Sequence, residues 1–578
     1  MSMPSEIAAQ VQTACVFILV GLGSCVNVEA QPRWHNLDAG HYSVGFRLLE
    51  ERDLARVVRG TDQPRPVRIY LWYPATASPG VLPMRFGRYA ALAEGDVWSA
   101  EIVGPLHEKL RYSRRALARS LGPDGFEALG EQRVRAFENA EPIPGPFPLI
   151  VVGQGLYYES PVAFAALSEY LAGRGFVVAT CPLVGTHSPL VKIGVEDLET
   201  QARDLEFVIA RAREFPHVSP DKLGVMGFDM GGMAGVILAM RNAGVDAFAS
   251  VPAGILFPHP SGLPRASPDY DPLALQVPWL HAAERWAATP PPGVQTASLF
   301  DTAVHSERYL LLIDDLDHVG STSYALVEGR NAVERYWTAW EAGEVERHET
   351  LSRYVSEFFT AFLMDSPESL AFLSRGPRQP VADSKLTIEH RSATPAPITH
   401  AEFVDALLTG DAASALEKVR GLRSTNPSSI LLKETYLRRL AHSLRNTWGL
   451  TEEGTHVMRL NEELNPAPTP TSVAEFTDGG AHGTVFLVAP AFGNLRMSFV
   501  KSDFRSLEIA PKTSFALRCR ETTVGVFFGE GFADVPRGAW VAFFSRDGML
   551  TVARNRASAA ETLNCRTGDA VFISSSNP

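Results

Sequence analysis

Lys222-Leu-Gly-Val-Met-Gly-Phe-Asp-Met-Gly-Gly232 is the stretch that decides the fold of this chain. An apolar run ends there in Gly-x-Asp-x-Gly-Gly, and residues 233–240 then place apolar side chains at helical spacing. The pattern predicts a strand, a tight turn and a helix. Glycines at 227 and 231 let two backbone segments pass close together, so the side chain of Asp229 is expected at the exposed end of the strand.

Further apolar runs alternate with helical patterns on both sides of this turn. The predicted strands are 67–73, 148–153, 176–180, 247–251, 277–282 and 308–313. Strands that alternate with helices at this spacing predict a doubly wound parallel sheet, covered on both faces. Ligands of such sheets bind beyond the carboxyl ends of the strands. Four polar residues fall there: Gln154, Asp229, Glu284 and His318.

The order of four motifs carries a resemblance to a known family. The chain contains, in this order, Leu71-Trp-Tyr-Pro74, Pro148-Leu-Ile-Val-Val-Gly-Gln-Gly-Leu156, Gly227-Phe-Asp-Met-Gly-Gly232 and Asp317-His-Val-Gly320. Over about residues 60–375 it resembles an α/β-hydrolase of the dienelactone hydrolase or platelet-activating-factor acetylhydrolase type.

The resemblance implies roles for individual residues. Asp229 takes the position of the nucleophile, which is a serine in that family, and His318 that of the general base. The backbone N–H groups of Met230 and Leu156 take the positions of the oxyanion hole. Gln154 stands where the family usually has histidine before the oxyanion loop, and it is a candidate pocket residue.

The carboxylate that orients the histidine is not at its usual place in this family. The position after the strand that ends at Val251 has no carboxylate. Glu284, at the end of the next strand, is therefore the predicted orienting acid. Asp315 and Asp317 are too close in sequence to His318 to be preferred as the orienting acid.

Three interpretations of Asp229 remain open. The carboxylate is a nucleophile that attacks carbon to give an ester, as in haloalkane dehalogenases and epoxide hydrolases, although those families usually have Trp where this chain has Met230. Alternatively, Asp229 acts as a base on water, or the fold has lost its serine and only binds. The predicted function is hydrolysis of the esterase or lactonase type on a small molecule, with no metal or redox cofactor. The alternative is a catalytically degenerate binding protein.

Residues 1–30 have the pattern of a targeting leader. The apolar run 14–28 is too short to span a bilayer and ends with small residues. Val28-Glu-Ala30 suits a signal peptidase, whereas Leu22-Gly-Ser-Cys25 resembles a lipoprotein box that would acylate Cys25. No Lys or Arg precedes the run. We expect an exported protein, either released or lipid-anchored.

Charge and cysteine content limit the partners and the compartment. The formal charge of -12 argues against nucleic acid or an anionic membrane surface as the main partner. The five cysteines show no metal-ligand spacing. Cys519 and Cys565 are predicted to form a disulfide in an oxidising compartment.

The region after the hydrolase-like domain (31–376) divides into a predicted linker at 377–398, a helical segment at 399–466 and a second linker at 467–478. The helical segment contains two helix pairs that end in Asn-Pro, at a spacing near the period of tetratricopeptide-like repeats. Two repeats are fewer than an independent solenoid needs. We therefore favour a helical spacer over a peptide-binding groove.

Strand patterns return at residues 479–578 and predict a small β-barrel or sandwich. Ala491-Phe-Gly-Asn494, Gly531-Phe-Ala-Asp-Val-Pro-Arg-Gly538 and the segment 547–559 resemble the C-terminal domain of S-adenosylmethionine hydroxide adenosyltransferases and the related fluorinase, over about residues 480–576. The resemblance implies an adenosyl ligand at Asn494, Arg554 and Ala557. Nothing earlier in the chain resembles the N-terminal domain of that family, so adenosyl transfer is not expected and binding remains open.

Overall fold

The computed structural model describes twelve ranges of residues: 37–58, 63–93, 112–283, 285–293, 296–333, 337–375, 386–446, 449–466, 470–489, 493–545, 547–555 and 557–575. The predicted leader, with Cys25, and the predicted orienting acid Glu284 lie outside them. The described chain divides into two compact units. The first contains the residues up to Glu51 and Pro66–Pro395, and the second contains Arg52–Arg65 and Ala396–Pro578.

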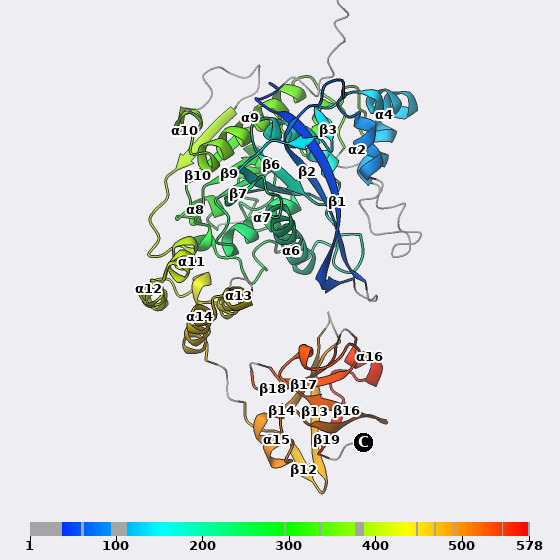
Figure 1. Cartoon of the computed structure of the whole chain (residues 1–578), viewed down its shortest axis with the longest axis vertical. Coiled ribbons are helices and arrows are strands. Elements are labelled where there is room, and N and C mark those ends of the chain that lie inside the picture. Colours follow the sequence, from blue (N-terminus) through cyan, green and yellow to red (C-terminus); the bar gives the residue numbers. More distant parts are fainter. Residues whose placement is uncertain are drawn as a thin grey trace, which may run out of the picture. The chain divides into compact units, whose positions relative to one another are not determined.

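An eleven-stranded sheet organises the first unit (Figure 1). Its order is β11-β10-β9-β8-β7-β5-β6-β2-β1-β3, and β4 pairs with β2. The bounds are β1 (Ser43–Val57), β2 (Pro64–Thr76), β3 (Ala136–Glu138), β4 (Glu141–Pro142), β5 (Phe147–Gly153), β6 (Val177–Thr180), β7 (Val218–Phe228), β8 (Ala247–Val251), β9 (Trp279–Ala283), β10 (Arg308–Ile313) and β11 (Leu386–Arg391).

The central strands of this sheet run parallel. Each neighbouring pair from β6 through β5, β7, β8 and β9 to β10 is parallel, whereas β2 is antiparallel to β6. All seven residues of β5 are buried, as expected for a strand covered on both faces. The carboxyl ends of these strands therefore share one edge, and the predicted doubly wound α/β sheet is confirmed.

Helices pack on this sheet and fix the strands. The long ones are α4 (Tyr112–Glu131), α6 (Val195–Ala212), α7 (Met230–Arg241) and α9 (Glu344–Leu363), and the shorter ones are α2 (Phe86–Ala93), α5 (Ala165–Gly173), α8 (Leu299–Thr302) and α10 (Pro367–Arg375). Helix α6 packs with α7, and α5 packs with α9. Every residue of α7 is buried, which holds the start of this helix, directly after Asp229, in a fixed place.

A buried polar chain links three of these elements. The indole N–H of Trp72 donates to the hydroxyl of Tyr89 (2.6 Å), and that hydroxyl donates to the carboxylate of Glu169 (2.7 Å). The backbone N–H of Arg135 donates to the other oxygen of Glu169 (2.9 Å). Because each buried group has a partner, the chain ties β2, α2 and α5 together without an unpaired charge.

Part of the predicted linker 377–398 is wrong. Residues 386–391 form β11, which pairs antiparallel with β10 from Arg308 opposite Arg391 to Ile313 opposite Leu386. Leu386 and Ile388 pack against the core, while alternate side chains are exposed. This period-two pattern is that of an edge strand. The prolines on both sides favoured the linker interpretation and hid the strand.

The helical segment of the second unit lies where the sequence placed it. Its helices are α11 (His400–Thr409), α12 (Ala412–Thr425), α13 (Glu434–Asn446) and α14 (Thr451–Leu464). Helix α11 packs with α12, and α13 packs with α14. The two predicted Asn-Pro ends are the C-caps of α12 and α14, at Asn426 and Asn465. Their tetratricopeptide-like character stays a prediction. Within the described ranges no helix is long and apolar enough to cross a membrane.

The C-terminal strands form a closed barrel, which confirms the predicted β-barrel. Its order is β13-β14-β18-β17-β16-β15-β19, and β19 pairs back with β13. The bounds are β13 (Gly480–Val488), β14 (Leu495–Val500), β15 (Ser514–Cys519), β16 (Thr522–Phe528), β17 (Trp540–Phe544), β18 (Met549–Arg554) and β19 (Ala570–Ser574), with helices α15 (Lys501–Ser506) and α16 (Ala559–Leu563). Strand β12 (Glu475–Thr477) pairs with β13. The second predicted linker, 467–478, is therefore too long at its end.

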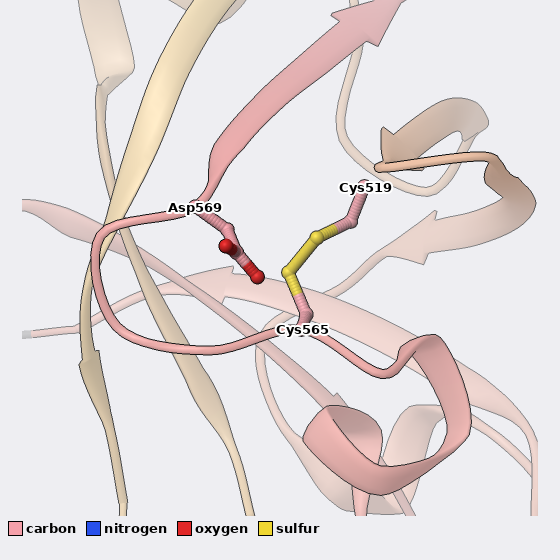
Figure 2. Close-up of side chains that lie close together, drawn as sticks. All are labelled: Cys519, Cys565 and Asp569. Carbon is pink, nitrogen blue, oxygen red and sulfur yellow. A yellow bond between two sulfur atoms is a disulfide. The ribbon is translucent and has the colours of Figure 1, made fainter.

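The predicted disulfide between Cys519 and Cys565 is present in the barrel. Figure 2 shows Asp569 beside it. The Asp569 carboxylate accepts hydrogen bonds from the guanidinium of Arg520 and the backbone N–H of Arg566. Within the described ranges, these two cysteines and Asp569 form the group whose atoms are spaced for a metal ion. Since both sulfur atoms are joined to each other, they are not available as thiolate ligands.

Reduction of this disulfide is expected to destabilise the barrel. The bridge closes a loop of 46 residues, and loop-closure entropy for that length corresponds to about 4 kcal/mol. Dithiothreitol should therefore shift the urea unfolding transition of the full chain to lower urea. The double variant Cys519→Ala/Cys565→Ala should unfold at this lower urea concentration with or without the reductant. An unchanged wild-type transition would show that the bridge does not form.

Candidate active site

Asp229 occupies the sharp turn between β7 and α7. Its backbone has φ 47° and ψ -116°, a conformation that residues other than glycine rarely adopt. Its N–H donates to the carbonyl of Pro252 (3.1 Å), and its carbonyl accepts from the N–H of Met233 (3.1 Å). Such strain persists only where the surrounding structure enforces it, and it is common at functional sites.

Glycines let the loop after β5 pass close to this turn. A Cβ on Gly231 would lie 2.3 Å from the carbonyl carbon and oxygen of Gly153. A Cβ on Gly155 would lie 2.7 Å from the Cβ of Asp229 and 2.5 Å from the ring of Phe228. All three distances are shorter than real Cβ contacts allow, so a larger residue at either position requires its neighbours to move.

The Asp229 side chain turns toward the predicted oxyanion hole. Its Oδ2 accepts a hydrogen bond from the backbone N–H of Leu156 (2.9 Å). Its other oxygen, Oδ1, has no hydrogen-bond donor among the described residues. Met230, whose N–H is the second predicted donor, is the first residue of α7 and is buried. The carboxylate thus accepts from one of the two predicted donors of the oxyanion hole.

Glu159 is a candidate site residue that no sequence motif marks. It follows a tight turn in which the N–H of Tyr158 donates to the carbonyl of Gly155 (3.2 Å) and Tyr157 has φ 68°. The N–H of Tyr157 donates to Oε1 of Glu159 (3.0 Å). Burial raises the pKa of Glu159 to about 7, against the effect of its backbone hydrogen bonds, and the negative charge of Asp229 adds to the rise. Two interacting carboxyl groups therefore meet at this edge of the sheet.

His318 lies beside the turn, as the order of the motifs implies. Its ring stands edge-on to the ring of Phe228, at 5.4 Å between centroids, and Phe228 directly precedes Asp229. The neighbouring Asp317 supports the loop, because its carboxylate accepts from the N–H of Gly320 (2.6 Å) and from the hydroxyl of Thr338 (2.6 Å). The role of His318 as a base stays a prediction.

Gln154 is fully buried at the end of β5. Its side-chain amide donates to the hydroxyl of Thr180 on β6 (2.8 Å), and its backbone carbonyl accepts from the side chain of Gln201 on α6 (3.1 Å). These bonds fix the start of the loop that carries Leu156 and Glu159. Gln154 is therefore a buried residue that positions this loop.

In the barrel, the three predicted adenosyl-binding positions lie on adjoining segments. The N–H of Ala560 donates to the carbonyl of Gly493 (2.9 Å), which brings Asn494 next to the segment that begins at Ala557. Arg554 forms a β-bridge with Ala557, and its guanidinium donates to the carbonyl of Gly538 (3.0 and 2.8 Å) and to the hydroxyl of Thr562 on α16 (3.0 Å). The guanidinium of Arg554 therefore holds a turn of the barrel.

The raised pKa of Glu159 predicts a pH-dependent stability. The folded chain holds this proton more tightly than the unfolded chain, so stability falls as pH rises from 4.5 through about 7. The full difference corresponds to up to about 3 kcal/mol. Near pH 8, Glu159→Gln should therefore unfold at a higher urea concentration than wild type. Near about pH 4, its urea midpoint should be no higher than that of wild type. Glu127→Gln, at an exposed position on α4, is the matched control and should show no such gap. Parallel stability curves for Glu159→Gln and wild type would contradict the raised pKa.

Comparisons with known proteins give a family match for the barrel. Residues 483–572 match the family model of the SAM hydroxide adenosyltransferase C-terminal domain. A search of curated proteins finds no match to this chain. The solved ferulic acid esterase from Streptomyces cinnamoneus is similar at 20% identity and TM-score 0.45, over 62% of this chain and 98% of the esterase. An uncharacterized conserved protein from Thermotoga maritima is similar at 21% identity and TM-score 0.17, over 18% of this chain and 40% of that one.

Proposed function

We propose that the first unit hydrolyses a small molecule through nucleophilic attack of Asp229 on an electrophilic carbon, as in the opening of an epoxide. The observation that carries this proposal is the hydrogen bond from the N–H of Leu156 to Oδ2 of Asp229 (2.9 Å). It fixes one carboxylate oxygen and leaves Oδ1 as the attacking atom. A nucleophile held in one orientation reacts faster because its ordering precedes the reaction.

The same N–H also suits the second half of the reaction. After attack by Oδ1, Asp229 is an ester whose carbonyl oxygen is Oδ2. When water adds to the Cγ of this ester, negative charge develops on Oδ2, where the N–H of Leu156 already points. Met230 supplies a second N–H by position. His318 activates the water, with Glu284 as the orienting acid predicted from its place at the end of a strand.

Acyl transfer of the serine type is less compatible with this arrangement. It requires a free oxyanion hole for the substrate carbonyl, and here Asp229 accepts from one of the two donors of that hole. It also requires a hydroxyl that forms an acyl ester, and residue 229 has none. We therefore favour attack on a saturated carbon, which needs only the carboxylate.

A substrate panel tests the proposal. Purified wild type is offered epoxides, alkyl bromides, lactones and activated aryl esters. We expect turnover of at least one substrate with an electrophilic saturated carbon. Turnover of the aryl esters alone would contradict attack on saturated carbon, and no turnover of any substrate would favour a binding protein.

The family match of residues 483–572 supports a second candidate function, the binding of an adenosyl ligand by the barrel. The adjoining segments of Asn494 and Ala557 are where such a ligand would sit. Calorimetry with S-adenosylmethionine and adenosine tests it. We expect saturable binding that is lost in Asn494→Ala and retained in Glu521→Ala, an exposed position on the turn between β15 and β16. Equal binding by both variants would place the ligand elsewhere.

We also propose an exported protein. The disulfide between Cys519 and Cys565 supports this proposal, because structural disulfides persist mainly in oxidising compartments. Fractionation of cells that express the full chain tests it, and recovery of the protein in the cytoplasm with both thiols free would contradict it.

A further inference from the structure

We propose that Glu159 is the proton donor to the leaving group in the reaction of Asp229, and that the substrate is therefore one whose leaving atom is an alkoxide oxygen, above all an epoxide. This inference rests on the proposed function, since it needs Asp229 as the nucleophile. It goes beyond that function because it assigns a third reacting group and selects among carbon electrophiles.

One turn of the backbone positions both carboxyl groups. The N–H of Leu156 donates to Asp229 (2.9 Å), and the N–H of the next residue, Tyr157, donates to Glu159 (3.0 Å). Gly155 approaches the Cβ of Asp229 closely, so this turn packs directly against the sharp turn between β7 and α7. Consecutive amides thus hold the nucleophile and the second carboxyl group at the same edge of the sheet.

The backbone of Glu159 is also fixed from the other side. Its carbonyl accepts from the N–H of Leu183, in the loop that follows β6 (2.9 Å). The next residue, Ser160, caps the short helix η3 (Pro161–Phe164) through its side chain. Glu159 is half-buried. The position of Glu159 is therefore fixed while its side chain stays partly accessible, as a proton donor to a bound substrate must be.

The local charges favour a single proton on the pair. Burial raises the pKa of Glu159, and the negative charge of Asp229 adds to the rise. His318, on the loop after β10, has its ring edge-on to that of Phe228. A carboxyl group whose pKa is raised to about 7 keeps a proton near neutral pH more readily than an ordinary glutamate does. Because Asp229 has the N–H of Leu156 at one oxygen and must attack as an anion, the proton belongs on Glu159.

The steps balance with this assignment. Oδ1 of Asp229 bonds to carbon as the carbon–oxygen bond of the substrate breaks, and the proton of Glu159 moves to the leaving oxygen. Water then adds to Cγ while His318 takes one of its protons. The bond between Cγ and Oδ1 breaks, and His318 returns the proton to the departing alkoxide. Asp229 is left as the acid, and its proton passes to Glu159. One water is consumed, and nothing is oxidised.

The need for a proton on the leaving atom distinguishes two classes of substrate. A bromide or a carboxylate leaves readily as an anion and gains little from an acid. An epoxide oxygen leaves as an alkoxide, which is a strong base, so protonation in the transition state lowers its barrier. General acid catalysis of this kind contributes about 10²–10⁴-fold.

The test compares an epoxide with an alkyl bromide of the same carbon skeleton. Glu159→Gln, which keeps an oxygen for the N–H of Tyr157, should lose at least about 100-fold in kcat on the epoxide and less than about 5-fold on the bromide. Glu159→Asp should restore part of the epoxide activity. Glu127→Gln, exposed on α4, is the matched control and should match wild type on both substrates.

Each other outcome overturns the proposal in a distinguishable way. Equal losses on both substrates in Glu159→Gln would mean that Glu159 only shapes the turn. Wild-type turnover of the bromide without the epoxide would reject the proton donor and leave the nucleophile in place. Turnover of neither substrate by folded wild type would reject the proposed function and this inference together.

Discussion

Asp229→Asn is expected to lose at least about 10⁴-fold in turnover of the substrate that wild type hydrolyses, because loss of a reacting side chain removes the whole covalent route. The amide has the same shape, and its oxygen still accepts from the N–H of Leu156. The variant should therefore fold and bind substrate, with the loss confined to kcat. Steady-state kinetics on the best substrate of the panel measures this.

Asp229→Ser is the informative companion to this variant. Serine is too short to fill the oxyanion hole, so the N–H of Leu156 becomes free for a substrate carbonyl. We expect weak hydrolysis of activated aryl esters to appear where wild type shows little. If Asp229→Asn retained full turnover, Asp229 would be neither nucleophile nor base, and the hydrolase fold would act through another site.

Gly231→Ala is expected to destabilise the first unit by more than about 3 kcal/mol, at the upper end for overpacking, because the clash involves backbone that cannot rotate away. The new Cβ would lie 2.3 Å from the carbonyl group of Gly153 and 2.7 Å from the carbonyl oxygen of Gln154. Relief requires that α7 separate from β5, which also moves the N–H of Leu156 away from Asp229. The urea midpoint of unfolding and the activity of the variant should therefore both be lower than those of wild type.

Gly194→Ala provides the matched control for this substitution. Gly194 lies in the same unit, directly before α6, and a Cβ there would meet no atom within 4 Å. Its effect on the free energy of unfolding should stay within about 0.5 kcal/mol, as for most surface positions. Similar stability of the two variants would show that β5 and α7 do not cross as closely as described.

The sequence allowed much of the fold to be predicted because its signals are local. The strand, turn and helix around Asp229 follow from periodicity and from two glycines. The disulfide followed from two cysteines within one predicted domain. Strand β11 was missed because prolines flank it and only six residues carry its pattern.

The candidate site was less predictable, because its chemistry depends on distances across the chain. Position and motif order marked Asp229, His318 and Leu156. Neither feature shows that the carboxylate of Asp229 accepts from the N–H of Leu156, since 73 residues separate the two. Glu159 carried no sequence signal at all. Its importance arises from burial and from the neighbouring charge of Asp229, which appear only in the folded chain.

The most direct test of the central claim is a single turnover in water labelled with oxygen-18, with enzyme in excess over substrate. If Asp229 forms an ester, the hydrolytic water attacks its Cγ and leaves its oxygen in the side chain. Mass spectrometry of the peptide that contains Asp229 should then show the label in that residue. Label in the product alone, with none in Asp229, would contradict the account and show that water attacks the substrate directly.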